Sequence, residues 1–149
     1  MPDTDTFHSS VRILVVDDLE PWRQRICSML QTRPELRVVA EAGDGLEAVQ
    51  KAQKLKPDLI LLDIGLPTLN GLEAADRIRQ VAPDARIIFL TQNSDRDVVR
   101  AALRAGARGY VLKADAGSEL FSAVEAVIGG DDFVSRGIKE AILTKPKMR

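Results

Sequence analysis

Short apolar runs alternate along this chain with longer segments in which apolar residues recur at helical spacing. Five runs, rich in Val, Ile and Leu, have the composition of strands that are covered on both faces. They are VRILVV (11–16), LRVVA (36–40), LILL (59–62), RIIFL (86–90) and GYVL (109–112). The helical periodicity begins after each run, at Trp22, Leu46, Leu72, Val98 and Leu120. The pattern predicts five strands and five helices in strict alternation.

This alternation predicts an α/β fold, a (βα)5 doubly wound sheet of five parallel strands with helices on both faces. Helix N-caps are expected at Asp44, Asn70, Ser94 and Ser118, because their side chains accept hydrogen bonds from free backbone amides. In open parallel sheets of this kind, ligands bind beyond the carboxyl ends of the strands. Functional residues are therefore expected at the strand ends.

Composition and charge narrow the class of protein. The 149 residues suit one domain, and a formal net charge of -1 argues against nucleic-acid binding through bulk charge. No apolar stretch approaches the roughly 20 residues that cross a bilayer, so a cytoplasmic location is expected. Cys27 is expected in the core. His8 is the only histidine and lies in a polar N-terminal segment, which excludes metal sites built from several histidines.

The predicted strand ends carry a distinctive set of polar residues. Asp17 and Asp18 follow the first strand and Asp63 the third, while Thr91 follows the fourth run and Lys113 the fifth. A single acid at such a turn is usually a helix cap. Three converging carboxylates repel one another, however, and require a cation or shifted pKa values. Mg²⁺ prefers such oxygen ligands, and a lysine with a hydroxyl completes a site suited to a phosphoryl group.

The motifs ILVVDD, LILLDIGLP, NGLE, IIFLT and GARGYVLK occur in this order and resemble the receiver domain of two-component response regulators. The resemblance covers residues 11–130. It implies a flavodoxin-like fold with strand order 2-1-3-4-5 and identifies Asp63 as the phospho-acceptor. It also implies that Mg²⁺ is the cofactor, held by Asp17, Asp18, Asp63 and the backbone carbonyl of Gly65.

The same resemblance implies a switch mechanism. Asp63 is expected to take phosphate from a phosphohistidine of a sensor histidine kinase or phosphotransfer protein, or from a small phospho-donor. Lys113 pairs with the phosphate, and Thr91 is the switch hydroxyl. Phosphate would draw Thr91 inward and let Tyr110, the aromatic switch residue, swing from an exposed to a buried position. The chain is thus expected to be a signalling switch, not an enzyme beyond its own phosphorylation and dephosphorylation, and to form homodimers when phosphorylated.

Within the family, DIGLP, GARGYVLKADAGSEL and AVIGGDDFVS are most similar to the branch that carries a C-terminal helix-turn-helix DNA-binding domain. The expected layout is a flexible tail over 1–10, the receiver domain over 11–130, and a C-terminal tail or start of a linker over 131–149, in which 138–143 could form a short helix. Binding to membranes or directly to nucleic acid is not expected of this chain alone. Transcription regulation would require a DNA-binding domain in the native protein.

Two positions depart from the usual pattern of the family. Gln92 follows Thr91 where a small residue is usual, which leaves the lifetime of the phosphate open. Ala114 follows Lys113 where many members have a proline after a cis peptide. We expect the Lys113–Ala114 peptide to be cis, in spite of the cost of about 2.5–4 kcal/mol without proline.

Other interpretations of the motifs explain fewer residues. GDGLEA (43–48) matches the G-x-G-x-x-A form of the dinucleotide fingerprint, but this leaves the strand-end acids and lysine without a role. A phosphatase of the haloacid dehalogenase type would require D-x-D, and Gly65 stands at the second acidic position. The remaining alternative is a pseudo-receiver, which keeps the fold but binds proteins constitutively. A response to Mg²⁺ with beryllofluoride or acetyl phosphate would distinguish the two.

Overall fold

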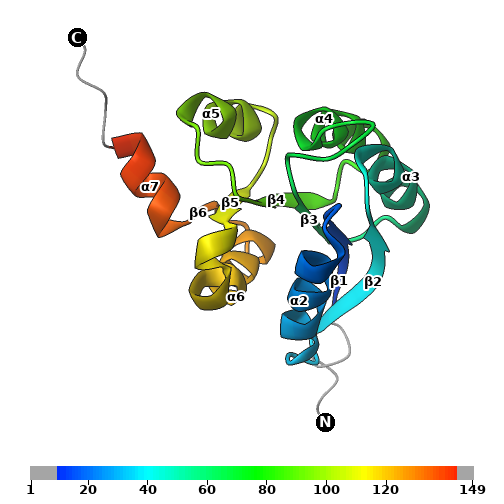
Figure 1. Ribbon diagram of the computed structural model, residues 1–149. Helices are drawn as coiled ribbons and strands as arrows, with labels where there is room; N and C mark the ends of the chain where they lie inside the picture. Colours follow the sequence, from blue (N-terminus) through cyan, green and yellow to red (C-terminus); the bar gives the residue numbers. More distant parts are fainter. Residues whose placement is uncertain (1–9, 144–149) are drawn as a thin grey trace.

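A parallel β-sheet with helices on both faces forms the core of the computed structural model, which describes residues 10–143 (Figure 1). The strands are β1 (Val11–Val16), β2 (Leu36–Ala42), β3 (Leu59–Leu62), β4 (Arg86–Thr91), β5 (Gly109–Leu112) and β6 (Phe133–Val134). Their order is β2-β1-β3-β4-β5-β6, and all neighbours are parallel. The predicted order of five strands is confirmed, and a sixth strand extends the sheet. His8 and the rest of segment 1–9 lie outside the described residues.

Helices cover the two faces of the sheet in separate groups. They are α2 (Glu20–Gln31), α3 (Gly45–Leu55), α4 (Gly71–Val81), α5 (Arg96–Arg104), α6 (Ala116–Ile128) and α7 (Arg136–Leu143), and a 3₁₀ turn, η1 (Lys113–Asp115), precedes α6. Helices α3, α4 and α5 lie on one face and α2 and α6 on the other, whereas α7 lies beside the β6 edge (Figure 1). The five predicted helices are confirmed, and α7 includes the short helix expected over 138–143.

Two of the four predicted N-caps are correct. The side chains of Asp44 and Asn70 each accept a hydrogen bond from an amide in the first turn of α3 or α4. Helix α5 is capped by Asp95 instead of Ser94, because the Asp95 carboxylate accepts from two free amides of the first turn. Ser118 lies inside α6, which continues directly from η1 and has no side-chain cap.

The sheet separates two apolar core clusters. Successive strand side chains point to opposite faces, so Leu14 and Val16 pack with α3, α4 and α5, whereas Ile13 and Val15 pack with α2 and α6. Cys27 is buried in the second cluster, as predicted, and burial raises the pKa of its thiol to about 11. Within residues 10–143, the helices are all too short or too polar to cross a membrane.

Candidate functional site at the carboxyl end of the sheet

The strand register brings the polar strand ends together. The last residues of β1 and β3 pair with each other, so Asp17 and Asp63, which follow them, emerge side by side. Thr91, the last residue of β4, pairs with the last residue of β5, which directly precedes Lys113. Residues that are up to about a hundred positions apart in sequence therefore meet at one edge of the sheet, as its parallel topology requires.

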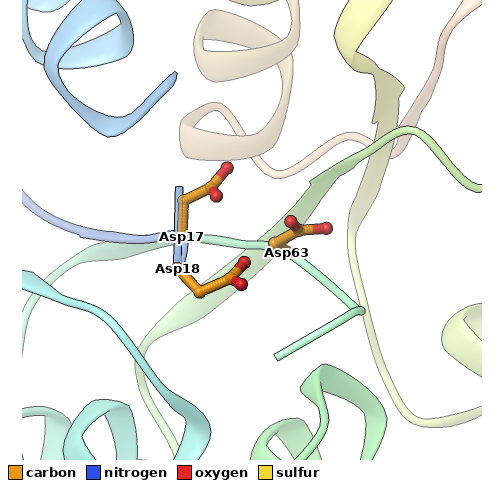
Figure 2. Close-up of side chains that lie close together, drawn as sticks. All are labelled: Asp17, Asp18 and Asp63. Atoms are coloured by element: carbon orange, nitrogen blue, oxygen red, sulfur yellow. The ribbon is translucent and has the colours of Figure 1, made fainter. Parts of the chain in front are cut away.

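Three carboxylates converge at the ends of β1 and β3 (Figure 2). Asp17, Asp18 and Asp63 each offer an oxygen that lies within 4.8 Å of those of the other two. Asp17 and Asp63 are buried, whereas Asp18 is exposed. The structure thus brings together the three acidic residues that the sequence analysis singled out.

Lys113 lies between two of these carboxylates. Its Nζ is 2.7 Å from Asp17 Oδ2 and 3.1 Å from Asp63 Oδ2, and its side chain is only 3% exposed. The ring of Trp22 lies against the ammonium, with the ring centroid 5.1 Å from Nζ. Three carboxylates and one ammonium leave the site with a formal excess of two negative charges. One divalent cation would cancel this excess.

Burial and pairing act together on Lys113 and Asp17, the partners of the shorter ion pair of the site. Burial raises the pKa of the Asp17 carboxyl, and the hydrogen bonds from Lys113 and the Leu19 amide offset this only in part. Burial lowers the pKa of Lys113, but the hydrogen bond to Asp17 and the charge of Asp63 outweigh it, so this pKa lies above its ordinary value. The first shift favours a neutral acid and the second a charged amine. The 2.7 Å contact favours the charged pair.

The strand ends border a cavity of about 410 Å³. Its wall includes five of the predicted site residues: Asp18, Asp63, Gly65, Thr91 and Lys113. The rest of the wall is formed by Leu19, Ile64, Gln92 and Asn93. Gly65 has open space around it, since a Cβ there would meet no atom within 4 Å. Gln92, the departure from the family pattern, therefore lies in the wall of the same cavity as Asp63.

A chain of hydrogen bonds connects Thr91 with Tyr110. The Thr91 hydroxyl accepts from the Asn93 amide at 3.3 Å, and the Tyr110 hydroxyl donates to the Asn93 carbonyl at 2.6 Å. The Tyr110 side chain is fully buried. The sequence interpretation assumed an exposed ring as the starting position, and the structure shows the buried position instead. The hydrogen bond to Asn93 and the packing of β6 and α7 beside the ring account for the difference.

Two residues that the sequence analysis missed support the site. Arg23 donates from Nη1 to the Asp17 carbonyl at 2.7 Å and from Nε to Glu41 at 2.9 Å, which ties the end of β1 to the end of β2. Its place in the first turn of the helix after the acidic pair is a weak signal that could have identified it. Asn93 bridges Thr91 and Tyr110, but its sequence context is that of an ordinary turn.

The Lys113–Ala114 peptide is trans, so the expected cis bond is wrong; residues 10–143 contain no cis peptide. Lys113 begins the η1 turn directly after β5, and from this backbone its side chain reaches both carboxylates. Without proline, a trans peptide is favoured by about 2.5–4 kcal/mol.

Gly71, the glycine of the NGLE motif, packs against the backbone of Asp63. A Cβ at this position would lie 2.1 Å from the Asp63 carbonyl oxygen. The Gly71 amide also donates to the Ile64 carbonyl at 2.7 Å. The absence of a side chain therefore allows the start of α4 to close on the turn that carries Asp63.

Comparisons with known proteins connect this geometry to one group. The family model described as the response regulator receiver domain matches residues 13–125. The transcriptional regulatory protein LnrK of Bacillus subtilis is 38% identical over 120 residues, which are 80% of this chain and 54% of LnrK. The nitrate/nitrite response regulator protein NarL of Escherichia coli K12 is 36% identical, over 85% of this chain and 58% of NarL. The chain thus spans between about half and two thirds of the length of such relatives.

A solved structure gives the same result. The crystal structure of a LuxR-family two-component response regulator from Aurantimonas sp. SI85-9A1 superposes with a TM-score of 0.86 at 36% identity. The match covers 91% of this chain and 96% of the other. Sequence and structure therefore indicate the same group of proteins.

Proposed function

The chain belongs to the response regulator receiver domain family of two-component systems, and we propose that it acts there as a switch whose phospho-acceptor is Asp63. One observation carries the proposal. Asp18, Asp63, Thr91 and Lys113 line a single cavity, and the Lys113 ammonium contacts both Asp17 and Asp63. Asp17 and Asp63 are both buried, paired with Lys113 and close to two other acids, but of these two carboxylates only Asp63 lines the cavity.

The proposed reaction is a phosphoryl transfer to a carboxylate. An oxygen of Asp63 attacks the phosphorus of a phosphohistidine, a P–O bond forms, and the P–N bond breaks with its electron pair going to the imidazole. Lys113, already 3.1 Å from Asp63, neutralises charge on the phosphoryl oxygens. The Thr91 hydroxyl donates a hydrogen bond to one of them. Water later attacks the acyl phosphate and restores the carboxylate, so the protein catalyses only its own phosphorylation and dephosphorylation.

The residues of the pocket fit Mg²⁺. They offer oxygen donors and an excess of two negative charges, which suits a small, hard divalent cation. Asp17, Asp18, Asp63 and the carbonyl of Gly65 would hold it. When bound, it supplies further neutralisation of the phosphoryl charge.

The proposal extends to partners and output. The phosphohistidine would belong to a sensor histidine kinase or a phosphotransfer protein in the cytoplasm, and a small phospho-donor could replace it. The signal would pass through the bonded series Thr91, Asn93 and Tyr110 to the face formed by α5, β5 and α6, on which β6 and α7 pack. A phosphorylated homodimer would form through this face and the segment that covers it. LnrK is named a transcriptional regulatory protein. By analogy, a DNA-binding domain in the native protein would convert the signal into transcriptional control.

The test is intact-mass spectrometry after incubation with Mg²⁺ and acetyl phosphate. The parent should gain the mass of one phosphate, and hydroxylamine should remove it because acyl phosphates react with this nucleophile. Asp63→Asn should gain none, whereas Asp84→Asn, which changes an exposed acid just before β4 at the amino end of the sheet, should behave like the parent. Labelling of Asp63→Asn would place the acceptor elsewhere.

A second measurement separates the switch from a pseudo-receiver. Trp22 lies against Lys113, so its fluorescence should change when Mg²⁺ and beryllofluoride, which mimics a phosphoryl group on a carboxylate, are added. A folded parent that gives neither a fluorescence change nor a mass increase would favour the constitutive binding module.

A further inference from the structure

The chain returns after α6 to the edge of the sheet and packs beside the switch tyrosine. We call residues 133–143, which comprise β6 and α7, the C-terminal arm. Strand β6 extends the sheet by pairing with β5, with Val134 opposite Tyr110. Ile138 of α7 is fully buried in the same apolar cluster as Tyr110. The arm therefore forms part of the surroundings that keep this ring buried.

Ser135 fixes the arm to the β5 backbone at the tyrosine and two residues after it. Its amide donates to the Tyr110 carbonyl at 2.9 Å, and its hydroxyl accepts from the Leu112 amide at 3.2 Å. The residue is fully buried, so neither bond competes with bulk water. Leu112 directly precedes Lys113, so the arm is bonded to the strand end that carries the phosphate-pairing lysine.

The beginning of α7 is held by carboxylates from η1 and α6. The Gly137 amide donates to Asp115 at 3.2 Å, and the Arg136 amide donates to Glu119 at 3.2 Å. Both acids thus satisfy free amides at the positive end of the helix. Asp115 belongs to the same 3₁₀ turn as Lys113. A movement of Lys113 toward a phosphoryl group would therefore reach the cap of α7 through one short turn.

We propose that docking of the C-terminal arm is coupled to the phosphorylation of Asp63, so that the arm is itself part of the output of the switch. This inference rests on the proposed function. The docked arm packs beside the buried Tyr110 ring, and phosphate favours the same buried ring through Thr91 and Asn93. A docked arm and an occupied pocket therefore stabilise each other. Such coupling typically changes an affinity by about 5- to 150-fold, and it acts equally in both directions.

The variant Gly137→Ala disturbs the arm without weakening its helix. A Cβ at this position would lie 2.7 Å from Leu112 Cδ1 and 3.0 Å from Asp115 Oδ2, so either these two side chains or α7 must shift, and the hydrogen bond from the Gly137 amide to Asp115 is disturbed in both cases. Alanine favours a helix more than glycine does, so a loss of docking cannot come from lower helix propensity. Gly117→Ala in α6 is the matched control, since its added Cβ would meet no atom within 4 Å.

The experiment measures beryllofluoride affinity with Mg²⁺ by Trp22 fluorescence, together with amide hydrogen exchange of the arm, in the full chain. Gly117→Ala should behave like the parent. Gly137→Ala should exchange its arm amides faster and bind beryllofluoride at least about fivefold more weakly. In the parent, beryllofluoride should slow the exchange of arm amides. Unchanged arm exchange in the parent on saturation with beryllofluoride would overturn the coupling, whatever the variants do.

Two further outcomes separate this inference from the proposed function. If the arm amides of Gly137→Ala exchange faster but its beryllofluoride affinity equals that of the parent, the coupling is wrong and the phosphorylation switch stands. If the parent fails to bind beryllofluoride, the switch itself is wrong and the coupling falls with it. Ile138→Ala, which removes the buried anchor of α7, repeats the affinity comparison through an independent contact.

Discussion

Ile78 and Ile138 are the same residue type, equally buried in the same apolar cluster, yet the elements that carry them differ in their anchorage. Ile78 lies in α4, which packs against α3 and covers one face of the sheet. Ile138 lies in α7, which packs mainly on β5 and α5 at the edge of the molecule (Figure 1). Equal burial therefore does not mean an equal role in stability, because an edge element can detach while the remaining core stays closed.

The acidic pocket and the C-terminal arm also differ in how firmly the rest of the fold anchors them. The pocket is built at the ends of central strands, where Lys113 and the carboxylates hold one another in a fixed geometry. The arm depends on one edge strand, two capping carboxylates, the two hydrogen bonds of Ser135 and one buried isoleucine. Chemistry that requires precise positions is thus placed at the centre, and the part best able to change position is placed at the edge.

The largest expected effect separates the two isoleucines. Ile78→Ala should lower the free energy of unfolding by about 2–5 kcal/mol, because it leaves a cavity in a core that cannot open locally. Ile138→Ala should lower the free energy of unfolding, measured with urea, by clearly less. It should instead speed amide exchange in α7. Equal losses in the two variants would show that the arm unfolds only with the whole sheet, and the comparison would fail.

A smaller effect is expected at the turn after β3. Gly71→Ala should lower stability by about 1–3 kcal/mol, since the added Cβ would lie 2.1 Å from the Asp63 carbonyl oxygen. Displacement of Asp63 should also slow phosphorylation by acetyl phosphate. Gly65→Ala is the control, because it keeps the backbone carbonyl and meets no atom; its stability should change by no more than about 0.5 kcal/mol. Unaltered phosphorylation of Gly71→Ala would refute the positioning argument.

The smallest effect concerns the two adjacent acids of the pocket. Asp18→Ala should weaken Mg²⁺ binding by at least about tenfold, because Asp18 lines the cavity and its carboxylate is not paired with Lys113, so it is free to bind the ion. Asp17→Ala should weaken binding less, since Asp17 is engaged with Lys113 and would act partly through water. Titration of Trp22 fluorescence with Mg²⁺ measures both. An affinity equal to that of the parent in both variants would refute the acidic pocket.

The elements with strong local signals were predictable from the sequence. Apolar runs and helical periodicity identify five strands and five helices, and the parallel topology places Asp17, Asp63 and Lys113 at the same edge of the sheet. The alternation alone does not determine which strands are neighbours; that order was implied by the family resemblance, and the structure confirms it. The Asp44 and Asn70 caps were predictable for a different reason, because a cap depends on the few residues next to it.

Only the tertiary structure decided the features that depend on distant partners. Strand β6 has two residues, too few for any periodicity, and it exists because the free edge of β5 offers amides and carbonyls to pair with. Arg23 and Ser135 act through bonds to the backbone of other elements, and Asn93 bridges Thr91 and Tyr110 with its own backbone amide and carbonyl. Residue type alone does not predict either kind of contact. The buried Tyr110 depends in turn on what packs beside β5. Local sequence specifies what each segment becomes, whereas long-range packing specifies what each segment touches.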